Sequence, residues 1–271
     1  MRKFLLLFAL CAPLAVFAQG KACFPHLKEA PFQGGENVSL SLMYKWGAVN
    51  TEVAQCVIKV ENSSLEGQPC YKTDVTVKSA PFFDIFFKMR EHFESWFTKD
   101  DLRPLVFKRD TFEGGYTAVN DYHYDWDAGV IHADVNFSSR GRQILDLPLE
   151  GCVYDLPALI YNLRAMDMSS FVVGKRMPLR FAIDDEVYDI FLTYKGEEVL
   201  KVRKMGKVKA HHFSCSVVQG EMFEGNQDVQ FWFTADENVL PLAVMAPLRV
   251  GAMWGWLKNY EGLKYDFTAR Q

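Results

Sequence analysis

One helical stretch in a chain of strand patterns is the feature that most constrains the fold. Within Gly151–Met166, apolar residues recur at the spacing of a helix with one buried face, namely Leu156, Leu159, Ile160, Leu163 and Met166. Asp155 suits the N-cap and Pro157 suits the first turn, so we predict a helix over about 155–166. Most other segments alternate apolar and polar residues, as half-buried strands do. The sequence therefore predicts a mainly β protein with one principal helix.

A segment of the first half recurs in the second half. Trp96-Phe97-Thr98 matches Trp232-Phe233-Thr234 at an offset of 136, and Pro104-Leu105 matches Pro241-Leu242 at 137. Two copies are too few for a solenoid. We therefore expect two related antiparallel, curved, barrel-like β units, about 37–150 and 171–265, with the helix between them. Because no linker rich in Pro or Gly separates the halves, we assign residues 37–271 to a single β-rich domain.

The N-terminus has the features of a secretory signal. Residues 1–18 combine a basic start, an apolar run and the short residues Val16 and Ala18, so we expect cleavage after Ala18. The run is too short to span a bilayer and is interrupted by Pro13. We expect an exported protein, periplasmic or secreted, with an N-terminal extension over 19–36 and no transmembrane segment in the mature chain.

Charge and cysteine content exclude several classes of protein. Without Arg2 and Lys3, 28 basic residues face 34 acidic ones, a net charge of −6 with no basic block, so nucleic acid is not an expected partner. Five cysteines remain, an odd number with no CxxC pair, so this is not a disulfide scaffold. A Cys56–Cys70 bridge would require a register that places Pro69 inside a strand, and the sequence leaves that bridge undecided.

Aromatic residues are abundant, with 22 Phe, 11 Tyr and 6 Trp. They suit a sheet core, which we favour, and they also suit a cavity for an apolar ligand. The dense apolar segment Pro81–Phe87 is either a plug at one end of the core, which we favour, or the mouth of such a cavity. The candidate ligand-binding residues are Phe82, Phe83, Phe86, Trp96 and Trp232.

The densest ionisable group is one face of a predicted hairpin. If Ala128-Gly129 form its turn, His123 lies opposite Asp134 and Asp125 lies opposite His132. These four residues are weak candidates for zinc ligands, and a solvated face with cross-strand charge pairs is the favoured interpretation. The sequence has no G-x-S-x-G, P-loop or H-E-x-x-H motif. We therefore predict no catalytic residues and no cofactor.

Four segments within roughly residues 35–265 carry a family resemblance: GENVSLSLMYKWGAV, HFESWFTKDDLRPLVFKRD, CVYDLPALIYNLRAMDM and FWFTADENVLPLAVMAPLRVGAMWGWL. They resemble the exported bacterial family catalogued as domain of unknown function 3108. The sequence departs from the family pattern at Leu156-Pro157, where a small polar residue is more usual. The resemblance implies an envelope or periplasmic β protein with barrel-like, partly open sheets, and it carries no catalytic residues.

Together these observations predict a non-enzymatic envelope protein that binds an apolar or amphipathic ligand in an aromatic-lined cavity. One alternative is a structural or assembly protein that joins an envelope protein partner through its strand edges. A less favoured alternative is a metal-dependent hydrolase using the His123/His132 face. The sequence leaves open the ligand, the existence of a cavity and the oligomeric state.

Overall fold

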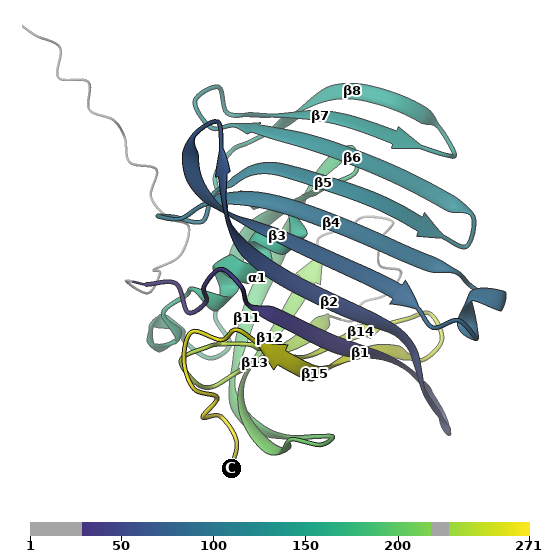
Figure 1. Cartoon of the computed structure of the whole chain (residues 1–271), viewed down its shortest axis with the longest axis vertical. Helices are drawn as coiled ribbons and strands as arrows, with labels where there is room; N and C mark the ends of the chain where they lie inside the picture. The colour runs from purple at the N-terminus through teal and green to yellow at the C-terminus, as the bar shows by residue number, and fades with distance from the viewer. Residues whose placement is uncertain (1–28, 218–227) are drawn as a thin grey trace, which may run out of the picture.

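A single curled sheet of 15 strands forms most of the protein, seen in a computed structural model that describes residues 29–217 and 228–271 (Figure 1). The strand order is β8-β7-β6-β5-β4-β3-β2-β1-β15-β14-β13-β12-β11-β10-β9. The strands of the first half are β1 (Asn37–Trp46), β2 (Val49–Leu65), β3 (Gln68–Ser79), β4 (Met89–Thr98), β5 (Pro104–Glu113), β6 (Tyr116–Asp125), β7 (Val130–Phe137) and β8 (Gly141–Pro148). Those of the second half are β9 (Val153–Tyr154), β10 (Arg176–Ile183), β11 (Glu186–Val202), β12 (Gly206–Val217), β13 (Val229–Thr234), β14 (Pro241–Pro247) and β15 (Ala252–Glu261).

The first and last strands meet in the middle of this sheet. β1 pairs with β2 on one side and with β15 on the other, so Ser41 lies between Gln55 and Trp256. The halves therefore share one hydrogen-bonded ladder (Figure 1). The mainly β, barrel-like fold with one principal helix is confirmed. Two separate β units are not confirmed.

Side chains, and not a strand ladder, hold the curled halves together opposite the β1–β15 junction. Arg109 of β5 binds Asp184 in the β10–β11 turn at 2.7 Å, and Arg140 of the β7–β8 turn binds Asp185 at 2.5 Å. The Tyr122 hydroxyl donates to the Asp184 carbonyl. Because β8 and β9 remain edges of the sheet, the barrel is incompletely closed.

The helix α1 (Leu156–Arg164) lies in the core, packed against β4 and β10. Asp155 caps it as predicted, since its carboxylate accepts the Ala158 N–H at 2.9 Å. The buried Asp155 carboxylate also accepts hydrogen bonds from Ser95 of β4 at 3.0 Å and Tyr124 of β6 at 3.4 Å. Side chains of the sheet therefore fix the start of the helix. Two short 3₁₀ turns complete the described part of the chain, η1 (Phe83–Ile85) and η2 (Met168–Ser170).

The polar end of α1 is buried as well. Arg164 forms a two-pronged ion pair with Glu36, at 2.5 and 2.8 Å, and both side chains are at most 1% exposed. Arg164 also donates to the carbonyls of Asn238 and Val239, while Asn162 donates to that of Leu102. The helix thus fills the space between the halves and binds turns from both.

The register of the β6–β7 hairpin differs from our prediction. Asp125 pairs with Val130 and His123 pairs with His132, so the turn contains four residues, Trp126–Gly129, and not two. The Asp125 carboxylate stabilises this turn by accepting the N–H groups of Asp127 and Ala128. The two-residue shift keeps every side chain on its predicted face, because side chains alternate with period two.

Cys56 and Cys70 are free thiols. In the β2–β3 register Cys56 lies opposite Val77, and Cys70 lies opposite Ser63. Within the described residues, no helix has the length and apolar character needed to cross a membrane. The predicted signal peptide lies outside the described residues.

Candidate functional site

A basic cleft lies between the tip of the β11–β12 hairpin and the outer face of β1 and β15. Four strands separate β11 from β1 in the sheet, yet residues 201–204 and β1 line the same cleft, of about 410 Å³. The hairpin must therefore curl back across the sheet, and its green tip lies below β15 in Figure 1. The ladder shifts register between Tyr194 and Gly196, where Gly196 has a φ of 105° that other residues rarely adopt.

Stacked indole rings form one side of this cleft and continue from it along the sheet. Trp256 lines the cleft, and its ring stacks on that of Trp254 with centroids 5.1 Å apart and planes 5° from parallel. Trp254 stacks on Trp232 at 5.7 Å, and Trp232 stacks on His212 at 4.6 Å. The two tryptophans of β15 share a face because they are two residues apart in a strand. These stacked rings, which we call the indole platform, lie on the outer side of the sheet, and Trp232 among them is only 6% exposed.

Lys45 of β1 connects the indole platform to the charged part of the cleft. Its ammonium nitrogen lies 4.2 Å from the Trp254 ring centroid and 5.4 Å from that of Trp256, within the range of cation–π attraction. Burial lowers the pKa of Lys45. A cation held against two indoles is a suitable partner for an anionic group lying over the same rings.

The remaining charges of the cleft are mostly positive. Among the described residues that line it, five are cationic and one is a carboxylate, Glu52. The cationic residues are Lys45, Lys201, Arg203, Lys204 and Lys258. Glu52 is paired with Lys258 at 3.0 Å. The cleft therefore presents a net positive charge beside an apolar platform, in a chain whose overall charge is negative.

A larger cleft, of about 650 Å³, lies beyond the end of α1 and is lined by several carboxylates. These groups already stabilise the backbone. Asp236 accepts the N–H groups of Asn238, Thr268 and Ala269, and Asp167 accepts the N–H and hydroxyl of Ser169. We therefore interpret this cleft as a hollow left between turns that these carboxylates stabilise, and not as the functional site.

A buried polar cluster lies on the inner face of β4, β5 and β6. Burial raises the pKa of the Glu91 carboxyl to about 7, although the Thr111 hydroxyl and Arg109 lie beside it. Glu91 Oε1 and both polar side-chain atoms of Asn120 have no hydrogen-bond partner among the described residues. Because Arg109 also binds the β10–β11 turn, we assign the cluster to closure of the barrel.

The predicted ligand-binding residues lie in three separate places. Phe82, Phe83 and Phe86 contact one another in the β3–β4 loop. Trp96 lies on β4, with the Lys72 ammonium 4.7 Å from its ring centroid. Trp232 alone belongs to the indole platform, and five strands lie between its strand, β13, and β4. The structure therefore does not bring these five residues into one cavity.

Trp254, Trp256 and Lys45 were missed as candidates. The spacing Trp-Gly-Trp in a strand already indicates two indoles on one face, and that signal could have identified the platform. Residues 201–204, which also line the cleft, could not be identified in the same way, since the tip of the β11–β12 hairpin reaches β1 only through the curl of the sheet.

The weak metal candidates do not converge. His132 pairs with Asp146 at 2.8 Å, His123 with Asp121 at 3.4 Å, and Asp134 with Arg142 at 2.5 Å. Asp125 stabilises its own turn. The four residues thus form the cross-strand charge pairs and local contacts of a solvated hairpin face.

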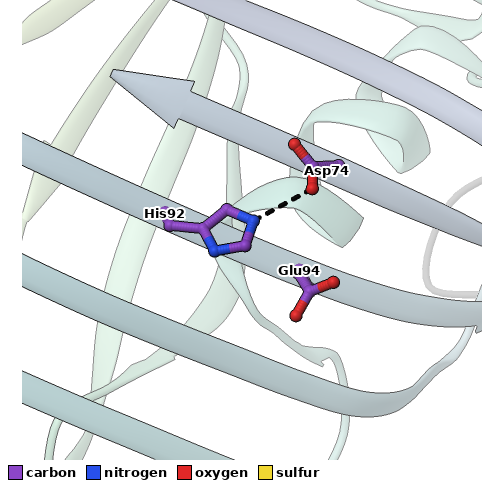
Figure 2. A group of neighbouring side chains, drawn as sticks. All are labelled: Asp74, His92 and Glu94. Atoms are coloured by element: carbon purple, nitrogen blue, oxygen red, sulfur yellow. Dashed lines mark hydrogen bonds and ion pairs between the residues drawn. The ribbon is translucent and has the colours of Figure 1, made fainter. Parts of the chain in front are cut away.

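A group of three potential ligands lies elsewhere, on the outer face of β3 and β4 (Figure 2). The ligand atoms of Asp74, His92 and Glu94 lie within 4.8 Å of one another. His92 Nε2 lies 2.9 Å from Asp74, and Glu94 binds Lys72 at 2.5 Å. A divalent cation would have to displace both the His92–Asp74 and the Glu94–Lys72 contact. We therefore interpret the three residues as ordinary polar and charged side chains paired on the surface.

These features define a class, the β-barrel-like proteins with one incompletely closed, mainly antiparallel sheet around a core helix. The sequence matches the family described as Protein of unknown function (DUF3108) over residues 41–254. The match covers most of the chain, and the protein belongs to this family.

One similar solved structure is the crystal structure of a β-barrel-like protein of domain of unknown function DUF1849 from Brucella abortus. It has a TM-score of 0.57 and 13% sequence identity, covering 88% of this chain and 100% of that one. At this identity the similarity concerns the fold alone. No curated protein matches the chain.

Proposed function

We propose that the protein is an exported, non-enzymatic binding protein of the cell envelope, and that the basic cleft takes an amphipathic anion. The observation that carries this proposal is the pair of stacked indoles, Trp254 and Trp256, under Lys45 at the wall of a cleft with five cationic residues. The family and the fold are compatible with a binding protein but do not themselves assign a ligand.

The chemistry of the cleft favours binding over catalysis. Apolar or planar parts of a ligand gain contact with the indole faces, and a carboxylate or phosphate gains charge-assisted hydrogen bonds from lysine and arginine. Glu52, the carboxylate among the described lining residues, is held by Lys258. That pairing leaves Glu52 poorly suited to act as a general base.

Two observations support export. The first 18 residues have the composition of a secretory signal. Cys152 is disulfide-bonded, and disulfides persist mainly in oxidising compartments. Cell fractionation with N-terminal sequencing of the mature protein tests this part of the proposal. Recovery of an uncleaved chain in the cytoplasm would contradict it.

Binding is tested with three probes, dodecyl phosphate, dodecyl maltoside and inorganic phosphate, by calorimetry below the critical micelle concentration. We expect dodecyl phosphate to bind most tightly because it alone combines a chain with an anion. Trp256→Ala and Lys45→Gln should each weaken binding by about tenfold, since each removes one of the two contacts.

Trp96→Ala is the matched control. Trp96 is also a strand tryptophan with a lysine over its ring, but it lies on β4, away from the cleft. Its loss should leave the affinity for dodecyl phosphate unchanged. Equal losses in Trp96→Ala and Trp256→Ala, or no binding of dodecyl phosphate by the wild type, would refute the assignment of the cleft.

A second candidate function, assembly through a strand edge, is favoured by one observation. β8 is an edge of the sheet, and its Ile144 side chain is 76% exposed. Exposed apolar edges are sites of strand addition by a partner. If β8 serves this purpose, Ile144→Lys should abolish a complex that the wild type forms in envelope extracts, while binding at the cleft is unaffected.

A further inference from the structure

Exposed apolar side chains gather on three loops at one end of the barrel. These are the β1–β2 turn, the β3–β4 loop and the β14–β15 turn, which lie toward the right of Figure 1. Their large apolar side chains are between 43% and 77% exposed: Trp46, Val49, Phe82, Ile85, Phe86, Phe87, Leu248 and Val250. We call these eight residues the apolar rim.

The three loops are linked to one another. The Tyr44 hydroxyl of β1 donates to the Val250 carbonyl at 3.1 Å, which joins the β14–β15 turn to β1. The Ala80 N–H donates to the Val53 carbonyl of β2 at 2.8 Å, which joins the start of the β3–β4 loop to β2. The apolar rim is therefore a composite surface on neighbouring strands.

The β3–β4 loop holds its aromatic rings outward through a defined polar network. Arg90 binds both carboxylate oxygens of Asp84, at 2.9 and 2.5 Å, and Arg90 also donates to the Ser79 hydroxyl at 2.9 Å. The hydroxyl of Ser79 in turn donates to Asp84 and accepts the Met89 N–H at 2.9 Å. This network fixes the loop while Phe82 and Phe86 remain exposed.

Basic residues flank the apolar ones on two of the loops. Lys45 precedes Trp46, and Lys88 follows Phe87. The carboxylate of the β3–β4 loop, Asp84, is neutralised by Arg90. The rim thus combines exposed aromatic rings with positive charge.

The combination of exposed aromatic rings and basic residues favours a lipid surface over a second copy of the chain as the binding partner. A second copy would place the basic residues of both rims against each other, and protein interfaces are depleted in lysine. Aromatic rings flanked by lysine and arginine are typical of segments that insert into the headgroup region of an anionic bilayer. We infer that the apolar rim docks the protein on an anionic lipid surface.

This inference goes beyond the proposed function and does not depend on it. Lys45 flanks the apolar rim at Trp46 and also lines the basic cleft, so the test leaves Lys45 unchanged. The variants alter the β3–β4 loop, none of whose residues line the cleft.

The test is co-sedimentation of the full mature chain with vesicles of equimolar phosphatidylcholine and phosphatidylglycerol, compared with phosphatidylcholine alone. We expect the wild type to bind the anionic vesicles preferentially. The double variant Phe82→Ser/Phe86→Ser should lose at least about tenfold in affinity, because two rings no longer enter the headgroup region. Val119→Ser, which removes an exposed apolar side chain from β6, outside the rim, should bind like the wild type.

Three results would overturn the inference. The first is a wild type that does not bind anionic vesicles, and the second is a double variant that binds them as well as the wild type. The third is a wild type that dimerises in analytical ultracentrifugation and a double variant that is monomeric but binds vesicles normally. A second copy of the chain would then be the partner that covers the apolar rim. The double variant should retain the wild-type melting temperature and its affinity for dodecyl phosphate, which separates this test from that of the cleft.

Discussion

Leu102 and Val239 occupy equivalent positions in the two halves of the chain, and one end of helix α1 binds both of their carbonyl groups. Asn162 Nδ2 donates to Leu102 at 2.8 Å, and Arg164 Nε donates to Val239 at 3.1 Å. Both turn residues have positive φ, 54° and 47°, which is uncommon for side chains of this size. The helix therefore stabilises two sterically restricted turns that the internal repeat places at equivalent positions.

The ion pair between Arg164 and Glu36 should be essential to stability. Arg164→Met leaves the Glu36 carboxylate buried without a partner and removes the hydrogen bonds to the β13–β14 turn. We expect the free energy of unfolding in urea to fall by about 3–5 kcal/mol.

Arg142→Met is the control for that substitution. Arg142 pairs with Asp134 on the exposed face of the sheet, so its loss should leave the free energy of unfolding nearly unchanged. If the two substitutions proved equally mild, the helix end would not hold the halves together as described.

Stability should decrease as pH rises from about 4 to about 7. Burial raises the pKa of Asp155 from 3.8 to about 7, so the folded state holds a proton that the unfolded state releases in this range. The protonated form contributes its full stability below the unfolded pKa, and this contribution is lost as pH rises through the folded pKa. Glu91, raised by burial from 4.5 to about 7, adds to the same slope.

The variant Asp155→Asn separates the contribution of Asp155 to this pH dependence from that of Glu91. The amide oxygen can still accept the Ala158 N–H, so the helix keeps its cap, but the residue no longer titrates. Urea unfolding across this pH range should show a shallower slope for the variant, and Glu91→Gln should remove most of the remainder. A variant slope as steep as that of the wild type would show that Asp155 ionises normally.

Local features of this fold were predictable from sequence, whereas long-range ones were not. The cap at Asp155 and the face of each strand follow from short spacings. The pairing of β1 with β15 joins residues more than 200 positions apart, such as Asn37 with Glu261, and no local pattern specifies it. The turn after Asp125 was mispredicted because a side-chain contact selected four residues where composition favoured two.

The site illustrates the same limit. The two tryptophans of β15 were visible as a pair on one face, but their importance depends on Lys201–Lys204 reaching across the sheet. That approach results from the curl of the β11–β12 hairpin at Gly196, and alternation alone does not determine how far a strand curls.

Gly255 should be intolerant of a side chain. A Cβ at this position would lie 2.6 Å from Val244 Cγ1 and 3.1 Å from Leu42 Cδ2, on the core side of the strand that carries Trp254 and Trp256. Because valine is stiff at χ1, Gly255→Ala should lower the free energy of unfolding by about 1–3 kcal/mol. Adding Val244→Ala should restore part of this loss, and strictly additive effects would argue against the contact.

The equivalent threonines of the repeat should respond alike. Thr98 Oγ1 accepts the Arg103 N–H at 3.0 Å and donates to Asp101, while Thr234 Oγ1 accepts the Leu240 N–H at 2.8 Å and donates to Asp236. Replacement by valine keeps the shape but removes the acceptor of the part-buried Arg103 N–H or of the buried Leu240 N–H. We expect thermal or urea unfolding to show losses of about 1–3 kcal/mol for each variant.

The loss should be larger for Thr234→Val than for Thr98→Val. Thr234 is fully buried, and its partner Asp236 also accepts the N–H groups of Thr268 and Ala269, so disturbing it loosens the C-terminal segment as well. Thr76→Val, on the outer face of β3, is the control and should be nearly neutral. If only one of the two threonine variants lowered the free energy of unfolding, the two turns would share a sequence pattern but not its contribution to stability.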